Sequence, residues 1–261
     1  MGSKDDYYNR AKQQGYRARS AYKLKQLDEE TNLFEEGDTV VDLGAAPGGW
    51  LQVAAEKVGP QGRVVGVDFQ SIDDLEPHQV KTMRGDMTEE QTRDRLRREL
   101  GIAERSSAGN QNAEPSGDVE DDERVVDVVI SDMAPNMTGE YELDHARSVH
   151  LARTAFETAL QYLKPGSDFV VKVFQGRDLD DFREDVEEEF QYVRTIAPPA
   201  SRDASSEVYL VGKGYTDTPV AVGDDFTVDI TDTGSEGDGI AKVNGYTLFV
   251  GGAEKGETER V

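Results

Sequence analysis

A lysine stands inside an apolar run in the second half of the chain. Lys172 has valines on both sides in the segment DFVVKVF (168–174). A run of this kind predicts a buried strand, where the loss of water disfavours the charged ammonium form. A buried lysine is therefore a candidate base toward a weakly acidic hydroxyl. The alternative is a lysine that extends from a strand edge to solvent.

A glycine-rich turn is the second candidate for chemistry. The segment VDLGAAPGGW (41–50) joins a predicted strand to a predicted helix, an arrangement that lets a cofactor lie against bare backbone. Pro47 occupies a place where the GxGxxG turn of dinucleotide enzymes needs a small residue, so a nicotinamide oxidoreductase is disfavoured. The turn alone predicts a nucleotide-type cofactor.

Two acidic residues follow at strand ends. Asp68 closes the next predicted strand, where a carboxylate can accept hydrogen bonds from both ribose hydroxyls of an adenosine. Asp86, in RGDM, closes the third and is a candidate partner for the adenine amino group. A solvated turn is an equally good explanation of Asp86.

These residues need a sheet to position them. Short apolar runs alternate with helical patterns, and the runs lie at 39–44, 63–68, 80–86, 125–132, 168–174 and 207–214. Apolar strands separated by helices indicate an α/β domain with a mainly parallel sheet covered on both faces. We predict this domain over residues 1–213, with a disordered insertion at 101–124, where the sequence lacks aromatic residues and periodicity. From residue 214 to 261, short strands broken by turns predict a small β-barrel.

Composition excludes several classes of site. The chain has no cysteine, and its three histidines show no ligand-like spacing, so we expect no metal. The segment MGSKDDYYNR has no apolar run, and no apolar stretch is long enough to cross a membrane. We therefore expect a cytoplasmic protein.

The charge is strongly negative and unevenly distributed. The net charge is −24, yet residues 1–25 sum to +5, which leaves −29 for the remainder. Such an acidic surface is tolerable at molar salt, where the screening length is about 3 Å, and so indicates a halophile. The basic N-terminal segment favours a nucleic-acid partner, although an ordinary solvated helix face is the alternative.

Three motifs together resemble the FtsJ/RrmJ/RlmE family of ribosomal RNA 2′-O-methyltransferases. They are VDLGAAPGGW, SDMAPNMTG (131–139) and FVVKVFQG (169–176), and the similarity extends over residues 7–213. The resemblance implies a Rossmann-like, seven-stranded sheet and S-adenosylmethionine as cofactor, bound by Gly48, Trp50, Asp68, Asp86 and Asp132. It also implies a catalytic set of Lys23, Asp132, Lys172 and Glu207.

The C-terminal segment 222–257 resembles a TRAM domain, a small RNA-binding barrel. The two resemblances imply a monomeric enzyme of a halophilic archaeon that methylates a uridine ribose in large-subunit (23S) ribosomal RNA. SDMAP differs from the NPPY-like sequence of amino-group methyltransferases, which disfavours base methylation. Two alternatives stay open, namely 2′-O-methylation of transfer RNA and a non-catalytic RNA-binding factor in ribosome assembly.

Overall fold

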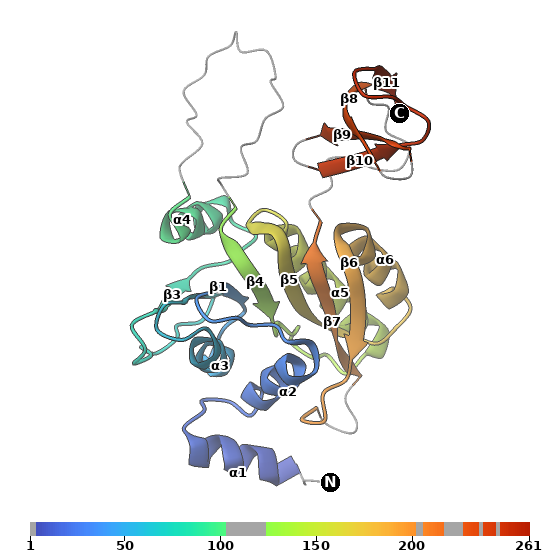
Figure 1. Cartoon of the computed structure of the whole chain (residues 1–261). Coiled ribbons are helices and arrows are strands. Elements are labelled where there is room, and N and C mark those ends of the chain that lie inside the picture. The colour runs from blue at the N-terminus through green and yellow to red at the C-terminus, as the bar shows by residue number, and fades with distance from the viewer. Residues whose placement is uncertain (1–3, 103–123, 202–205, 217–226, 235–236, 244–245) are drawn as a thin grey trace. The chain divides into compact units, whose positions relative to one another are not determined.

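The computed structural model describes residues 4–102, 124–201, 206–216, 227–234, 237–243 and 246–261. These residues form two compact units, a larger one up to Thr216 and a smaller one from Thr227 onward (Figure 1). The insertion predicted at 101–124 falls almost entirely outside the described residues.

The larger unit is built on a seven-stranded sheet in the order β3-β2-β1-β4-β5-β7-β6. The first five strands in this order are parallel, β7 is antiparallel to β5, and β6 is antiparallel to β7. The predicted mainly parallel sheet is therefore confirmed. Its strands are β1 (Thr39–Leu43), β2 (Arg63–Asp68), β3 (Val80–Arg84), β4 (Val126–Ser131), β5 (Leu163–Phe174), β6 (Phe190–Ile196) and β7 (Glu207–Tyr215).

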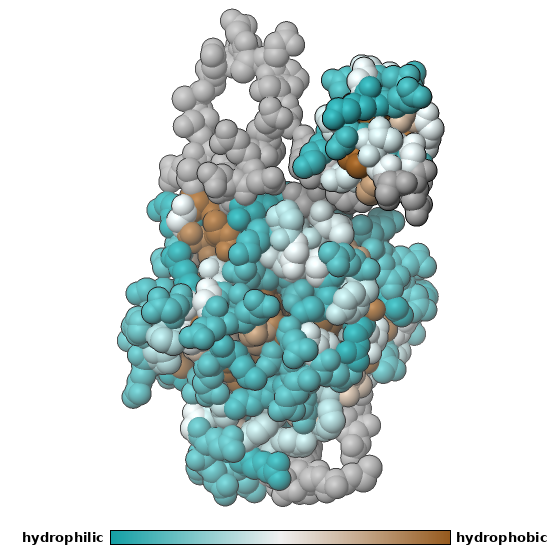
Figure 2. All heavy atoms as spheres, viewed as in Figure 1, coloured by the Kyte–Doolittle hydropathy of each residue, from teal (hydrophilic) through white to brown (hydrophobic). Residues whose placement is uncertain are grey.

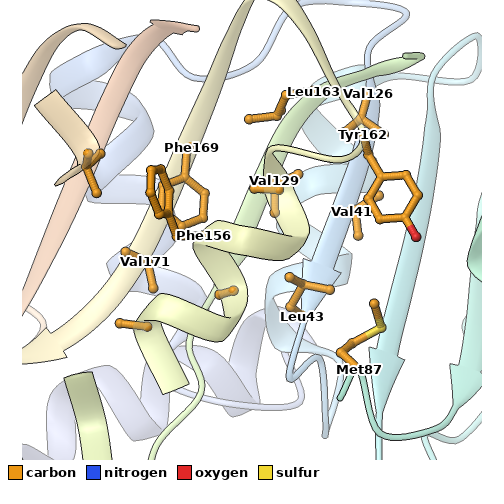
Figure 3. Packing of buried hydrophobic residues seen from close by; sticks show 14 of the residues in the cluster. Val41, Leu43, Met87, Val126, Val129, Phe156, Tyr162, Leu163, Phe169 and Val171 are labelled. Carbon is orange, nitrogen blue, oxygen red and sulfur yellow. The ribbon is translucent and has the colours of Figure 1, made fainter. Parts of the chain in front are cut away.

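Among the described residues, five helices cover the two faces of this sheet and a sixth, α1 (Lys4–Gln14), packs on α2 (Ala21–Thr31). The other four are α3 (Gly49–Val58), α4 (Glu90–Leu100), α5 (Tyr141–Ala159) and α6 (Leu179–Glu189). The first three pack into one apolar cluster and the last three into another on the opposite face. In the second cluster, Phe156 of α5 lies against Phe169 and Val171 of β5 (Figure 3). Both faces of the central strands are thus buried, which is why their sequences are apolar at successive positions.

One edge of the sheet collects the candidate residues. Parallel strands end at the same edge, so the residues after β1, β2, β4 and β5 all lie there. Because β7 runs in the opposite direction, it begins at this edge, with Glu207 paired to Phe174 at the end of β5. The topology therefore brings Asp68, Asp132 and Glu207 to the same edge, where the parallel strands end.

Polar side chains cover most of the larger unit's surface in the view of Figure 2. This agrees with the net charge of −24. A surface of this kind stays soluble in concentrated salt because its carboxylates remain hydrated while their repulsion is screened.

The smaller unit is an antiparallel sheet in the order β10-β9-β8-β11. Its strands are β8 (Thr227–Thr233), β9 (Gly239–Val243), β10 (Tyr246–Val250) and β11 (Thr258–Arg260). Val228, Ile230, Ala241 and Ala253 form its small core. The predicted small, all-β C-terminal module is thus confirmed as a separate antiparallel sheet, with β10 and β11 as the outer strands among those that the structure describes.

Candidate active site

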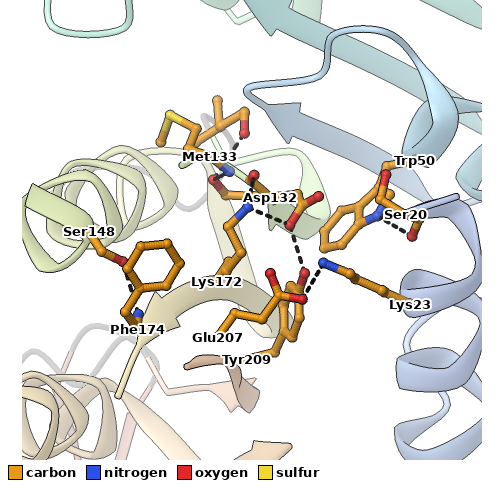
Figure 4. Close-up of polar contacts among 12 residues, drawn as sticks. Ser20, Lys23, Trp50, Asp132, Met133, Ser148, Lys172, Phe174, Glu207 and Tyr209 are labelled. Carbon is orange, nitrogen blue, oxygen red and sulfur yellow. Dashed lines mark hydrogen bonds and ion pairs between the residues drawn. The ribbon is translucent and has the colours of Figure 1, made fainter. Parts of the chain in front are cut away.

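The strand lysine is paired with the acid that follows the neighbouring strand. Lys172 Nζ donates to the Oδ1 atom of Asp132 at 2.9 Å and to its main-chain oxygen at 2.5 Å (Figure 4). The pairing follows from the sheet register, in which Ser131 of β4 lies beside Val171 of β5. Lys172 is only 7% exposed, so its hydrogen bonds to Asp132 are needed to compensate for the lost water.

A second ion pair joins helix α2 to strand β7. Lys23 Nζ lies 2.5 Å from Glu207 Oε1, and the two side chains are 7% and 12% exposed. Lys23 extends from the buried face of α2, next to Leu24 and Leu27. The helix is therefore fixed against the sheet at the place where the catalytic set was predicted.

Tyr209 connects the two ion pairs and was not predicted. Its hydroxyl donates to Asp132 Oδ1 at 2.7 Å, and Lys23 Nζ lies 5.7 Å from its ring centre (Figure 4). Burial, followed by the nearby carboxylates of Asp132 and Glu207, raises the Tyr209 pKa well above its usual value. The phenol thus stays protonated and donates to Asp132 at neutral pH. The period-two alternation of a strand, which places residues 207 and 209 on one face, is the signal that could have revealed it.

A cavity of about 460 Å³ opens beside this cluster. Its polar wall includes Asp68, Asp86 and Asp132, and its apolar wall includes Val67, Phe69, Met87 and Leu151. Gly44, also in the wall, has a φ of +82°, and a side chain there would overlap Met133. The turn after β1 therefore needs glycine for both its backbone conformation and the close approach of the loop after β4.

Asp68 is oriented toward this cavity by two backbone donors. Its Oδ2 accepts from Ala46 N at 2.9 Å, and its Oδ1 accepts from Gln70 N at 2.7 Å. A carboxylate has about four acceptor positions, so acceptor capacity remains for a ligand. Asp86 is exposed, and hydrogen bonds from the Thr88 backbone and side chain lower its pKa.

Gly48 and Trp50 were also predicted to bind cofactor, but neither is among the residues that line the cavity. Gly48 adopts a φ of +105° at the start of α3, close to Arg17. Trp50 is 3% exposed, donates from its indole nitrogen to Ser20 O at 2.8 Å and packs on Tyr209. In this structure both connect α3 to the N-terminal segment.

Asp42 is a further carboxylate of interest. It is 1% exposed, and neither side-chain oxygen has a hydrogen-bond partner in the part of the chain that the structure describes. Burial, then the carboxylates of Asp132 and Asp68, raises the Asp42 pKa well above its usual value. The neutral form of this acid is therefore favoured.

The part of the chain that the structure describes offers neither a metal centre nor a membrane-spanning helix. Within the described ranges, no group of three His, Asp or Glu side chains is arranged to hold a metal ion. Nor does any described helix have the length and apolar character needed to span a membrane.

Comparison with known proteins adds to this geometry. Residues 219–261 match the TRAM domain. The chain is 65% identical over 261 residues to the ribosomal RNA large subunit methyltransferase E of Halorubrum lacusprofundi, with 100% of this chain and 89% of that protein covered. Identity to the protein of the same name from Natronomonas pharaonis is 60%, again over the whole chain and over 94% of the relative.

A solved structure shows the same fold. A Plasmodium falciparum protein assigned as a ribosomal RNA methyltransferase superimposes with a TM-score of 0.60 at 24% identity, over 77% of this chain and 98% of that one. The FtsJ-like methyltransferase family matches residues 16–215, which include the cavity, both ion pairs and Tyr209. The chain belongs to the FtsJ-like methyltransferase family.

Proposed function

We propose that this protein transfers the methyl group of S-adenosylmethionine to a ribose 2′-hydroxyl, that of a uridine in large-subunit ribosomal RNA, with Lys172 as the base. The observation that supports this most directly is that Asp132 belongs both to the cavity wall and to the ion pair with Lys172. A cofactor in the cavity and the lysine therefore share one wall. The names of the relatives, ribosomal RNA large subunit methyltransferase E, favour ribosomal over transfer RNA.

The cavity fits the proposed cofactor. Its volume of about 460 Å³ lies in the range of small-molecule sites, and its wall combines an oriented carboxylate with apolar side chains. Asp68 would accept from the ribose hydroxyls, while Val67, Phe69 and Met87 would surround the adenine. When bound, S-adenosylmethionine supplies a methyl group on a positively charged sulfur, which is ready for displacement.

In this proposal, Lys172 removes the hydroxyl proton. As a base, Lys172 would act in its unprotonated form, whose two hydrogens could be donated to the two acceptors on Asp132. The lone pair is then left to take the proton of the 2′-hydroxyl as that oxygen bonds to the methyl carbon. The protonated Tyr209 donates to the same Oδ1 atom of Asp132 and so helps to hold the carboxylate that orients the lysine.

The test is turnover by Lys172→Arg. Arginine keeps the positive charge but cannot lose a proton, so we expect a fall in kcat of about 100-fold or more, the usual contribution of a general base. Cofactor affinity, measured by calorimetry, should stay unchanged. Lys164→Arg is the matched control, because Lys164 lies at the other end of β5 and is half-exposed beside Asp127. Activity in Lys172→Arg equal to that of the control would show that the lysine only neutralises charge.

The RNA substrate is tested separately. Mapping of 2′-O-methyl groups in ribosomal and transfer RNA from cells that lack the protein should reveal one missing group in large-subunit RNA. If the missing group is in transfer RNA instead, the proposed reaction stands and its substrate is transfer RNA. If all groups are retained, the protein is a binding factor and the enzymatic proposal fails.

A further inference from the structure

We propose that the exposed ring of Tyr141 is a stacking platform for an unpaired RNA base next to the methylated nucleotide. This inference rests on the proposed function. Tyr141 is the first residue of α5, and its side chain is 57% exposed. Exposed aromatic rings are common, so the argument depends on how this one is held and where.

The ring is fixed by its own hydroxyl. Tyr141 Oη donates to the main-chain oxygen of Gln175 at 2.7 Å. An anchored hydroxyl limits the rotation of the side chain while its ring remains in contact with solvent. A rigid, exposed ring loses little entropy when a base stacks on it.

The helix beneath the ring is fixed in the same way. His145 and Ser148 follow Tyr141 on the same helix face at intervals of four and three residues. His145 Nδ1 lies 3.1 Å from Phe174 O, and its Nε2 accepts from Asp178 N at 3.1 Å. Phe174 N donates to Ser148 Oγ at 2.9 Å (Figure 4). The start of α5 is thus attached to the backbone that directly follows the strand of Lys172.

The ring also lies between the two loops that extend from the reaction centre. The loop from Asp132 to Glu140 leads directly into α5, and Asp144 holds it by accepting from the backbone nitrogens of Thr138 and Gly139 at 2.8 and 3.0 Å. The anchor, Gln175, is three residues beyond Lys172, or roughly 10 Å of extended chain. This separation places a neighbouring nucleotide on the ring, rather than the one that reacts.

The charges around Tyr141 favour an RNA base over a phosphate group at this place. Glu140 and Glu142 flank Tyr141, and a nearby cation, Arg177, is already paired with Asp178, so a phosphate at this place would meet more negative than positive charge. Stacking involves the neutral face of a base, accepts any of the four bases and depends little on salt. Sequence-specific recognition of RNA commonly holds splayed bases on aromatic rings in this way.

The experiment combines two tyrosine variants with a modified RNA. The substrate is an RNA fragment that contains the target nucleotide in its unmethylated form. With it, Tyr141→Ala should raise the KM for RNA at least about fivefold and leave kcat within about twofold. The KM for S-adenosylmethionine should not change. Tyr141→Phe keeps the ring but loses the hydrogen bond to Gln175, so its KM for RNA should lie between those of the wild type and Tyr141→Ala. Tyr192→Ala is the control, because Tyr192 is 51% exposed but pairs with Lys213, at the opposite end of the sheet.

An abasic residue placed in turn on each side of the methylated nucleotide then locates the contact. At one position the abasic substitution should raise the KM for the wild type but add nothing to Tyr141→Ala. Additive effects at every position would overturn the proposal. So would a Tyr141→Ala defect that is seen only with whole ribosomal subunits, because that result would indicate a protein partner. If wild-type enzyme methylates no RNA fragment or subunit, the proposed function has failed instead.

Discussion

Replacing Lys172 by methionine should destabilise the larger unit as well as stop turnover. The variant keeps most of the volume of the side chain but removes both hydrogen bonds to Asp132. The carboxylate, whose side chain is 19% exposed, would then keep Tyr209 as its one side-chain donor among the described residues. Breaking a fully buried pair costs roughly 3–5 kcal/mol. With Tyr209 and some water still available, we expect about 2–3 kcal/mol.

A double-mutant cycle isolates this contribution. Asp132→Asn alone leaves Lys172 with a neutral partner, whereas the double variant Lys172→Met with Asp132→Asn has no charge at this place. We therefore expect the double variant to be more stable than the sum of the two single losses predicts, by at least about 1 kcal/mol. Kinetics should show no such recovery, because the base is still missing.

The assay is urea unfolding in molar potassium chloride, followed by the fluorescence of Trp50. Trp50 is the single tryptophan of the chain and packs 5.8 Å from Tyr209, so its emission reports on the larger unit at the site itself. Losses that add within about 0.5 kcal/mol would refute the reasoning, since they would mean that the pair contributes nothing to stability.

Three further predictions concern the cofactor, a buried acid and the smaller unit. Asp68→Ala should weaken S-adenosylmethionine binding by about 1–3 kcal/mol, measured by calorimetry, and unchanged affinity in a folded variant would remove Asp68 from the cofactor site. Because the Asp42 pKa is raised in the folded state, wild-type stability should fall as pH rises above the unfolded value of about 3.9, and Asp42→Asn should remove that part of the fall. The measurement is the urea midpoint of the wild type and of Asp42→Asn at several pH values. Parallel curves of midpoint against pH for the two proteins would contradict the prediction. Deletion of residues 217–261 removes Phe249, which is 68% exposed, and should raise the KM for RNA several-fold at high salt without altering the KM for the cofactor. Equal KM values for RNA would leave stability as the role of this unit.

The sheet could be predicted wherever a strand is buried on both faces. All six predicted runs correspond to strands, but β6, with the sequence FQYVRTI, was missed. Only Phe190, Val193 and Ile196 of this strand are buried, because it lies at the edge of the sheet. An edge strand is partly solvated and so lacks the continuous apolar run that marks the central strands. The other edge strand, β3, was predicted although only Met83 of it is buried.

The site was predictable to the extent that strand ends define it. The pairing of Lys172 with Asp132 follows from two adjacent parallel strands, as does the position of Asp68. Tyr209 was missed, because the shared face of residues 207 and 209 places it at the site only once β7 is known to lie antiparallel to β5, and a tyrosine in an apolar strand is usually core. The cofactor role predicted for Trp50 stays a prediction, because it depends on a side-chain direction that its position in the glycine-rich segment does not fix, and Trp50 does not line the cavity.

The basic N-terminal segment has less free charge than its sum of +5 suggests. Lys23 is paired with Glu207 inside the site, and Lys25 lies over the Tyr16 ring and 3.3 Å from Glu56. Arg17 donates to the main-chain oxygens of Pro47, Asp73 and Asp74, and so fixes the glycine-rich turn. These three cations serve the structure of the larger unit. In molar salt, where each phosphate contact contributes little, the enzyme must hold RNA mainly by shape and by stacking. This is why a single anchored tyrosine beside the reaction centre has more to contribute here than a cluster of lysines would.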